Sequence, residues 1–222
     1  MATSQNLASI SFNNNMQNIV GLYAITPDMD DSEQLSLKVE AALRGGVRLL
    51  QYRHKTAHHA LKLEQASVLL SLCHHYDAKL IINDDVSICL AINADGVHLG
   101  ASDSKIDTAR KILGSDKIIG ASCYNQLDLA RSAQNAGASY VAFGTCFFSR
   151  NKPNAPQVSL SLFAQAKKEL TLPVVAIGGI TLINASSIIE AGADAIAVIN
   201  HLFSASNITT RAKHYTELFY NA

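Results

Sequence analysis

Positive charge and hydrogen-bond donors are concentrated in the segment Gln51-Tyr52-Arg53-His54-Lys55, which follows an apolar run. On an extended strand, side chains two apart point to the same side, so Gln51, Arg53 and Lys55 share a face while the strand continues. Two cations and an amide would then face the same side, where they could bind an anion. The alternative is a solvated charge pair at the end of a strand.

Carboxylates follow two later apolar runs. Asn83, Asp84 and Asp85 come directly after Leu80-Ile81-Ile82, and Asp103 follows His98-Leu99-Gly100. Magnesium binds one or two carboxylates together with waters and substrate phosphates, a set that Asp84 and Asp103 could supply. Either aspartate could instead cap a helix, since Asp is a preferred N-cap residue, and capping suits Asp85 best.

Neutral donors end other runs. Ser122 ends one, and Gly178-Gly179 end another, where backbone N–H groups could approach phosphate oxygens. The alternative for the glycine pair is relief of crowding at a turn. His98 is expected to be a hydrogen-bonded histidine of the core rather than a catalytic base. The remaining candidates are Ser149, Arg150, Asn151 and Lys152, in the loop after the sixth run, and Ile199 and Asn200, at the end of the eighth.

Eight short apolar or β-branched runs, alternating with segments of helical spacing, must position these residues. The expected strands are residues 20–26, 48–53, 79–83, 96–99, 118–122, 140–144, 173–178 and 195–200. Junctions at 45–46, 94–95, 137–138 and 192–193 close a helix before a new strand. The pattern predicts an α/β fold, a single (βα)8 TIM barrel with its site at the carboxyl ends of the strands. The alternative is an open doubly wound sheet, but no G-x-G-x-x-G follows the first strand.

Length and composition limit the classes of protein to which this chain can belong. The 222 residues suit one domain, with residues 19–222 as the barrel and the Asn- and Ser-rich residues 1–18 as a loose N-terminal tail. Lys plus Arg and Asp plus Glu both total 18, which argues against nucleic acid or an anionic membrane as a partner. The four cysteines lack C-x-x-C spacing and are expected to be reduced and mostly buried. The charge-free run 170–189 contains proline and glycines, so we expect no membrane span and a cytoplasmic protein.

Four motifs together resemble the thiamine-phosphate synthases: Q-Y-R-H-K at 51–55, I-I-N-D-D at 81–85, D-G-V-H-L-G at 95–100 and V-V-A-I-G-G-I at 174–180. The resemblance implies condensation of an aminopyrimidine diphosphate with thiazole phosphate. It implies that the diphosphate substrate is bound by Gln51, Tyr52, Arg53, His54, Lys55, Asn83, Ser122 and Lys152. It implies that thiazole phosphate is bound by Ser149, Arg150, Asn151, Gly179, Ile199 and Asn200, and Mg²⁺ by Asp84 and Asp103. The catalytic residues would be Arg53, Lys55, Ser122 and Lys152.

Three residues depart from the family pattern: Asn151 and Asn200 replace hydroxyl residues, and His201 replaces a small residue and is expected to crowd the thiazole phosphate. One alternative is a thiazole tautomerase, which has a histidine where this chain has Tyr124. Another is a non-catalytic phosphate-binding barrel. The sequence leaves both a monomer and a homo-oligomer open.

Overall fold

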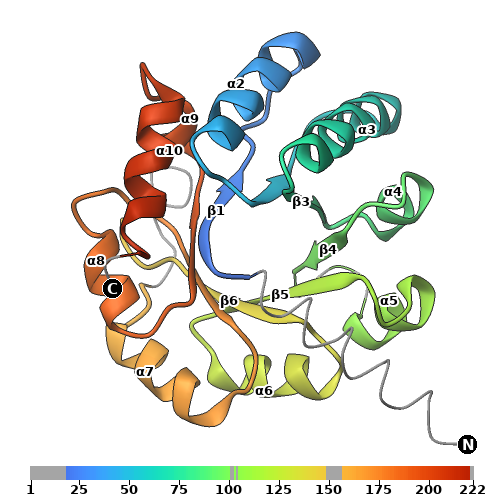
Figure 1. Cartoon of the computed structure of the whole chain (residues 1–222). Helices are drawn as coiled ribbons and strands as arrows, with labels where there is room; N and C mark the ends of the chain where they lie inside the picture. Colours follow the sequence, from blue (N-terminus) through green and yellow to red (C-terminus); the bar gives the residue numbers. More distant parts are fainter. Residues whose placement is uncertain (1–18, 101–102, 104, 149–156, 221–222) are drawn as a thin grey trace, which may run out of the picture.

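The computed structural model describes residues 19–100, 103, 105–148 and 157–220, within which eight parallel strands close into a barrel in chain order (Figure 1). The strands are β1 Gly21–Ile25, β2 Leu49–Tyr52, β3 Lys79–Asn83, β4 Gly96–Leu99, β5 Ile118–Tyr124, β6 Tyr140–Phe143, β7 Val174–Ile177 and β8 Ala195–Val198. The predicted (βα)8 barrel is confirmed. The predicted tail, residues 1–18, lies outside the described residues.

Helices surround the barrel, as Figure 1 shows. They are α2 Ser32–Arg44, α3 His59–His75, α4 Val86–Ala91, α5 Ile106–Leu113, α6 Leu127–Asn135, α7 Leu160–Glu169, α8 Ala185–Glu190, α9 Asn200–Phe203 and α10 Ile208–Glu217. Several helices end as the junctions predicted, because Gly46, Gly137 and Gly192 have φ of 97°, 91° and 110°. Before β4 the left-handed residue is instead Asn93, at φ 56°.

Strand boundaries differ from the predicted ones mainly at the carboxyl ends. Thr26, Arg53 and Gly178 each lie one residue beyond their strand, and Asn200 already begins α9. Gly178 has φ of 104°, which extended backbone does not adopt. Thr26, Arg53 and Gly178 thus belong to the loops at the mouth of the barrel. β5 instead continues to Tyr124, with a register shift after Ser122.

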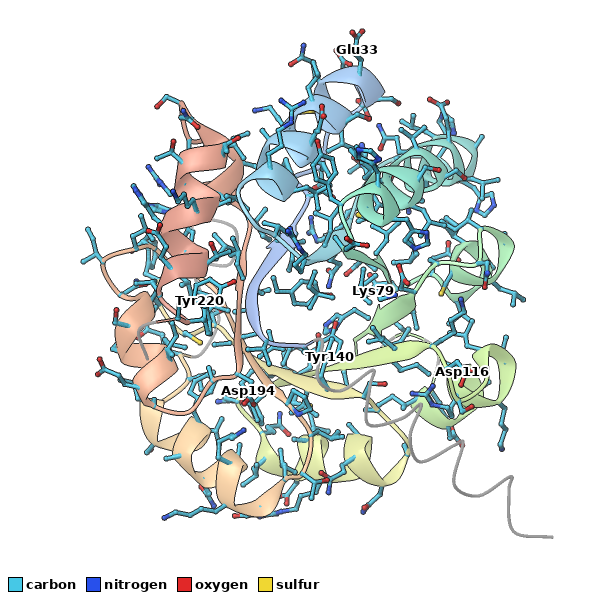
Figure 2. The ribbon with its side chains drawn as sticks, viewed as in Figure 1. Glu33, Lys79, Asp116, Tyr140, Asp194 and Tyr220 are labelled. Carbon is cyan, nitrogen blue, oxygen red and sulfur yellow. The ribbon has the colours of Figure 1, made fainter. Side chains whose placement is uncertain are left out.

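Alternation along each strand divides the core into two layers. Leu50 and Tyr52 of β2 pack with helix residues in the outer layer, whereas Leu49 belongs to a second cluster inside the barrel, which contains no helix residues. Tyr23 and Tyr140 are the largest side chains of this interior, and Figure 2 shows Tyr140 within the ring of strands. The same alternation turns Gln51 inward at the carboxyl end of β2.

All four cysteines are free and buried, as predicted. No helix in the described part of the chain is long and apolar enough to cross a membrane.

Candidate functional site

The segment after β2 is fixed by the loop that follows β1. The Thr26 hydroxyl donates to the Arg53 carbonyl oxygen (3.0 Å) and accepts from the Arg53 N–H (2.8 Å). Asp28 Oδ1 accepts from Arg53 Nη1 (3.1 Å) and from the Lys55 N–H (2.8 Å). Sequence reasoning missed Asp28 and Thr26, although both stand in the T-P-D that ends the first predicted strand. They, rather than the strand alternation, set the positions of Arg53 and Lys55.

Tyr52 and His54 have protein partners of their own. The Tyr52 hydroxyl donates to Gln65 Oε1 on α3 (2.8 Å). His54 is buried, its Nε2 lies 3.1 Å from Asp30 Oδ1, and its Nδ1 accepts from the Ala57 N–H. Both side chains therefore hold the Arg53–Lys55 segment in place through hydrogen bonds to other protein groups. Their contact with a substrate stays a prediction.

Asp84 and Asp103 are brought together at the ends of β3 and β4. Burial, a hydrogen bond with Asp103 and repulsion by its charge raise the pKa of Asp84 to about 6. Asp84 has φ of 63°, and its N–H donates to the His98 carbonyl oxygen (2.8 Å). A left-handed non-glycine residue at a strand end is typical of functional sites. Asn83 Nδ2 donates to Asp84 Oδ2 (2.6 Å).

This pair suits a magnesium ion. The negative charge of Asp103 disfavours the ionised form of Asp84, and a divalent cation between the two would relieve this repulsion. Magnesium binds one or two carboxylates beside waters and phosphates. Within the described residues no cluster of three or more such ligand side chains occurs. Asp85 has the other predicted role, because its side chain caps α4 by accepting from the Ile88 N–H (3.0 Å).

A cavity of about 660 Å³ opens beside these groups. Lys55, Asn83 and Asp84 line it together with Lys62 of α3, which sequence reasoning did not single out. The positive charge of Lys55 also acts to lower the pKa of Asp84. Lys55, Lys62 and Asp84 therefore line one cavity, which offers two cations and a carboxylate to a ligand.

His98 is a hydrogen-bonded core histidine, as predicted. Its Nδ1 lies 2.9 Å from the Tyr140 hydroxyl and its Nε2 lies 2.9 Å from Ser122 Oγ. Burial lowers the pKa of His98 to about 4, so the ring is neutral at pH 7. Ser122 is thus held at the mouth by a side chain from the neighbouring strand.

The neutral His98 predicts a pH dependence of stability. Since the pKa is about 4 when folded and about 6.5 when unfolded, the unfolded chain binds more protons below pH 6.5. We expect the free energy of unfolding to fall between pH 6.5 and 4, by about 3 kcal/mol from this group. Urea unfolding of the wild type and of His98→Asn across this range measures it. If the free energy of unfolding changed equally with pH in the two proteins, the prediction would be wrong.

The turn after β7 is held by the side chain of Asn184. Asn184 Oδ1 accepts from the Thr181 N–H (2.8 Å), and Asn184 Nδ2 donates to the Gly179 carbonyl oxygen (3.1 Å). The N–H groups of Gly179 and Ile180 have no acceptor among the described residues. Gly179 has φ of 66°, and a Cβ there would lie 2.5 Å from the Phe148 carbonyl oxygen. A side chain at residue 179 would therefore have to displace the backbone at Phe147 and Phe148.

Tyr215 of α10 ties this turn to the end of β8, a link that sequence reasoning missed. Its hydroxyl lies 3.3 Å from the Ile180 carbonyl oxygen and 2.7 Å from His201 Nδ1. The structure thus brings the turn containing Gly179 close to Ile199 and Asn200, which form the N-cap and first residue of α9.

His201 packs against α10. Arg211 Nη1 donates to the His201 carbonyl oxygen (3.0 Å) and lies against the ring, beside Tyr215. Burial and the charge of Arg211 lower the pKa of His201. The ring is occupied by these contacts, which explains how the fold accommodates a histidine where the resemblance has a small residue. Ser149, Arg150, Asn151 and Lys152 lie outside the described residues, so their roles stay predictions.

Comparisons with known proteins identify the family and the relatives that this chain resembles. The family model described as thiamine monophosphate synthase matches residues 22–202. The thiamine-phosphate synthase of Methylobacillus flagellatus is 56% identical over 201 residues, 90% of this chain and 96% of that protein. That of Thiobacillus denitrificans is 49% identical, with 90% and 94% covered. The solved thiamine phosphate pyrophosphorylase from Pyrococcus furiosus superposes with a TM-score of 0.83 at 33% identity, covering 92% of this chain and 98% of that one.

Proposed function

Because the chain belongs to the thiamine monophosphate synthase family, we propose that it is a transferase that makes thiamine phosphate. It condenses 4-amino-2-methyl-5-(diphosphooxymethyl)pyrimidine with thiazole phosphate and releases pyrophosphate. The observation that carries this proposal is the pairing of Asp84 with Asp103, beside a cavity that Asp84 lines together with Lys55. Neither the tautomerase nor the non-catalytic alternative is favoured by these relatives.

The residues at the mouth are suited to a diphosphate leaving group. Arg53, Lys55 and Lys152 bind the diphosphate oxygens and stabilise the negative charge that grows as the bond from the pyrimidine methylene to oxygen breaks. Asp84 and Asp103 would hold Mg²⁺, which when bound neutralises further charge on the diphosphate. The positive charge of the three side chains and the metal together is larger than the negative charge of the two aspartates. The net positive charge favours departure of pyrophosphate.

The second substrate completes the reaction without a general base. The neutral thiazole nitrogen attacks the cationic pyrimidine methylene carbon and becomes a thiazolium nitrogen, so no proton need be removed from it. Gly179, Ile199 and Asn200 hold the thiazole phosphate through backbone N–H groups and the Asn200 amide. Ser149, Arg150 and Asn151, which lie outside the described residues, are proposed to bind the same phosphate.

One assay tests the proposed activity. Purified protein is incubated with the aminopyrimidine diphosphate, thiazole phosphate and Mg²⁺, and thiamine phosphate and pyrophosphate are quantified. Both products should form in equal amounts and only when both substrates are present. Release of pyrophosphate without thiamine phosphate, or no turnover, would contradict the proposal.

Arg53→Ala should lower kcat by roughly 100-fold, the usual loss when one donor to a developing anion is removed, and should change the KM for thiazole phosphate little. Arg53→Lys should recover only part of kcat, because an ammonium cannot reproduce the forked contact that lets Arg53 bind Asp28 and a phosphate oxygen together. Steady-state kinetics with each substrate varied measure both.

Arg48→Ala is the matched control, since Arg48 precedes β2 at the other end and donates to the carbonyl oxygens of Leu43 and Val47. Its kcat should stay near the wild-type value. If Arg53→Ala chiefly raised the KM for thiazole phosphate, Arg53 would belong to the other substrate's site.

A further inference from the structure

An unbroken chain of hydrogen-bonded side chains crosses the interior of the barrel below the mouth. Gln51 Nε2 lies 2.9 Å from the Tyr23 hydroxyl, which lies 2.8 Å from the Tyr140 hydroxyl. Tyr140 in turn lies 2.9 Å from His98 Nδ1, and His98 Nε2 lies 2.9 Å from Ser122 Oγ. The two ends of the chain, Gln51 and Ser122, are both predicted to bind the aminopyrimidine diphosphate.

Packing fixes the middle of this chain in one geometry. The His98 ring stacks on Tyr140 with centroids 5.6 Å apart, and Tyr23 meets Tyr140 edge-on at 5.9 Å. Gly120 of β5 makes room for the Tyr140 ring, because a Cβ there would lie 2.1 Å from Cζ. Tyr23 and Tyr140 are essentially inaccessible to solvent. The hydrogen bonds of this chain can therefore reverse their direction far more easily than the side chains can exchange partners.

Each of the three middle side chains, Tyr23, Tyr140 and His98, carries one proton that can take part in these hydrogen bonds. Burial raises the pKa of Tyr23 and of Tyr140, so both phenols keep their proton, and it lowers the pKa of His98, so the ring is neutral with one N–H. A phenol with one proton that donates on one side must accept on the other. Since unpaired buried polar groups are costly, only two arrangements satisfy the whole chain.

In the first arrangement the donors point from Gln51 toward Ser122. The Gln51 amide donates to Tyr23, Tyr23 to Tyr140, and Tyr140 to His98 Nδ1, so His98 Nε2–H donates to Ser122. The Ser122 proton is then free to donate into the mouth, and the Gln51 carbonyl oxygen is free to accept. In the second arrangement every donor is reversed: Gln51 offers its NH₂ to the mouth, and the Ser122 proton is committed to His98.

We propose that Tyr23, Tyr140 and His98 are positioning residues that couple Gln51 to Ser122, and that the chain runs in the first arrangement. This deepens the proposed function and rests on it. A diphosphate can only accept hydrogen bonds, so Ser122 must donate to it. The exocyclic amine of the pyrimidine is a donor, so Gln51 must accept from it. Only the first arrangement lets Ser122 donate and Gln51 accept at the same time. It disfavours a pyrimidine with a carbonyl in place of the amine, because that carbonyl oxygen would face the Gln51 carbonyl oxygen.

The direction of the chain can be measured without substrate by ¹⁵N NMR of the imidazole nitrogens, with the His98 signals assigned by their loss in His98→Gln. The expected result is the tautomer with the proton on Nε2 and none on Nδ1. Tyr140→Phe should change this tautomer or place it in exchange, because Nδ1 loses its donor. A proton on Nδ1 in the wild type would overturn the assigned direction.

The coupling is tested by affinity for the aminopyrimidine diphosphate against its oxo analogue, in which a ring carbonyl replaces the exocyclic amine, by calorimetry without thiazole phosphate. The wild type should prefer the amine by at least about tenfold, as one mismatched buried hydrogen bond costs. Tyr23→Phe and Tyr140→Phe should each reduce this preference severalfold, because the Gln51 amide can then turn freely. An unchanged preference in both variants would overturn the coupling.

Two controls separate this inference from the proposed function. Tyr76→Phe removes a hydroxyl that contacts Glu40 at the surface, so it should keep the wild-type preference. Gln51→Ala and Ser122→Ala remove the ends of the chain and should weaken binding of the aminopyrimidine diphosphate. If they did not, the proposed substrate contacts would fail, whereas the NMR tautomer would still decide the direction of the chain.

Discussion

Replacing either Asp84 or Asp103 by asparagine is expected to lower kcat by about 10²- to 10³-fold, because the metal contributes several kcal/mol of charge stabilisation and each variant removes one of its two carboxylates. The fold should survive. Asparagine tolerates the left-handed backbone of residue 84, at φ 63°, better than other non-glycine residues. Steady-state kinetics over a range of Mg²⁺ concentrations should show that excess metal restores part of the rate.

Asp85→Asn is the control for this prediction. Asp85 is adjacent in sequence but caps α4, and asparagine is an equally good N-cap residue, so its kcat and its metal dependence should stay near wild type. The apparent pKa near 6 of the metal-free site should disappear in Asp84→Asn. Full activity of the wild type in excess chelator would remove both aspartates from the mechanism.

The barrel was predictable because its signal is local. Strand residues such as Leu49 and Leu50 are apolar on both faces, as strands buried on both sides must be, and the intervening helices carry their own apolar spacing. The ends of elements were less predictable. Asn93, with φ 56°, ends a helix without glycine, and β5 runs past Ser122, because tertiary contacts rather than local preference decide such positions.

Individual site residues were predictable where a polar side chain follows an apolar strand, as for Asp84 and Ser122. Partners distant in sequence were not. Asp28 positions Arg53 from the loop after β1, and Tyr215 reaches the turn after β7 from α10. Asp28 does follow the first predicted strand, but the sequence does not show that it pairs with Arg53 or that Tyr215 meets the turn, since each contact exists only after the barrel closes.

The interior chain shows the same limit. Tyr23 and Tyr140 stand in ordinary apolar runs, and either could be a buried aromatic with no further role. Their meeting depends on the strand register, in which Gly120 pairs with Tyr140 and so leaves room for its ring. Register is set only when two strands pair, so it cannot be read from a single sequence.

Gly179→Asp is expected to weaken binding of thiazole phosphate by at least about 100-fold. A carboxylate beside a phosphate costs several kcal/mol at the effective dielectric of a partly buried site, and every 1.4 kcal/mol is a factor of ten. Part of the loss is steric, because a Cβ at residue 179 would lie 2.5 Å from the Phe148 carbonyl oxygen and 2.7 Å from that of Phe147. Calorimetry with thiazole phosphate measures the total.

Gly179→Asn separates the two causes, since asparagine has the size of aspartate, tolerates φ of 66° and carries no charge. Its affinity should fall between those of the wild type and Gly179→Asp, and the gap between the two variants should narrow as salt rises. Asn200→Ser should change the affinity by less than about tenfold, because backbone N–H groups dominate and each side chain adds at most one neutral donor. If Gly179→Asp bound thiazole phosphate as tightly as Gly179→Asn, no phosphate would lie beside this turn, and the assignments of Gly179, Ile199 and Asn200 would fail together.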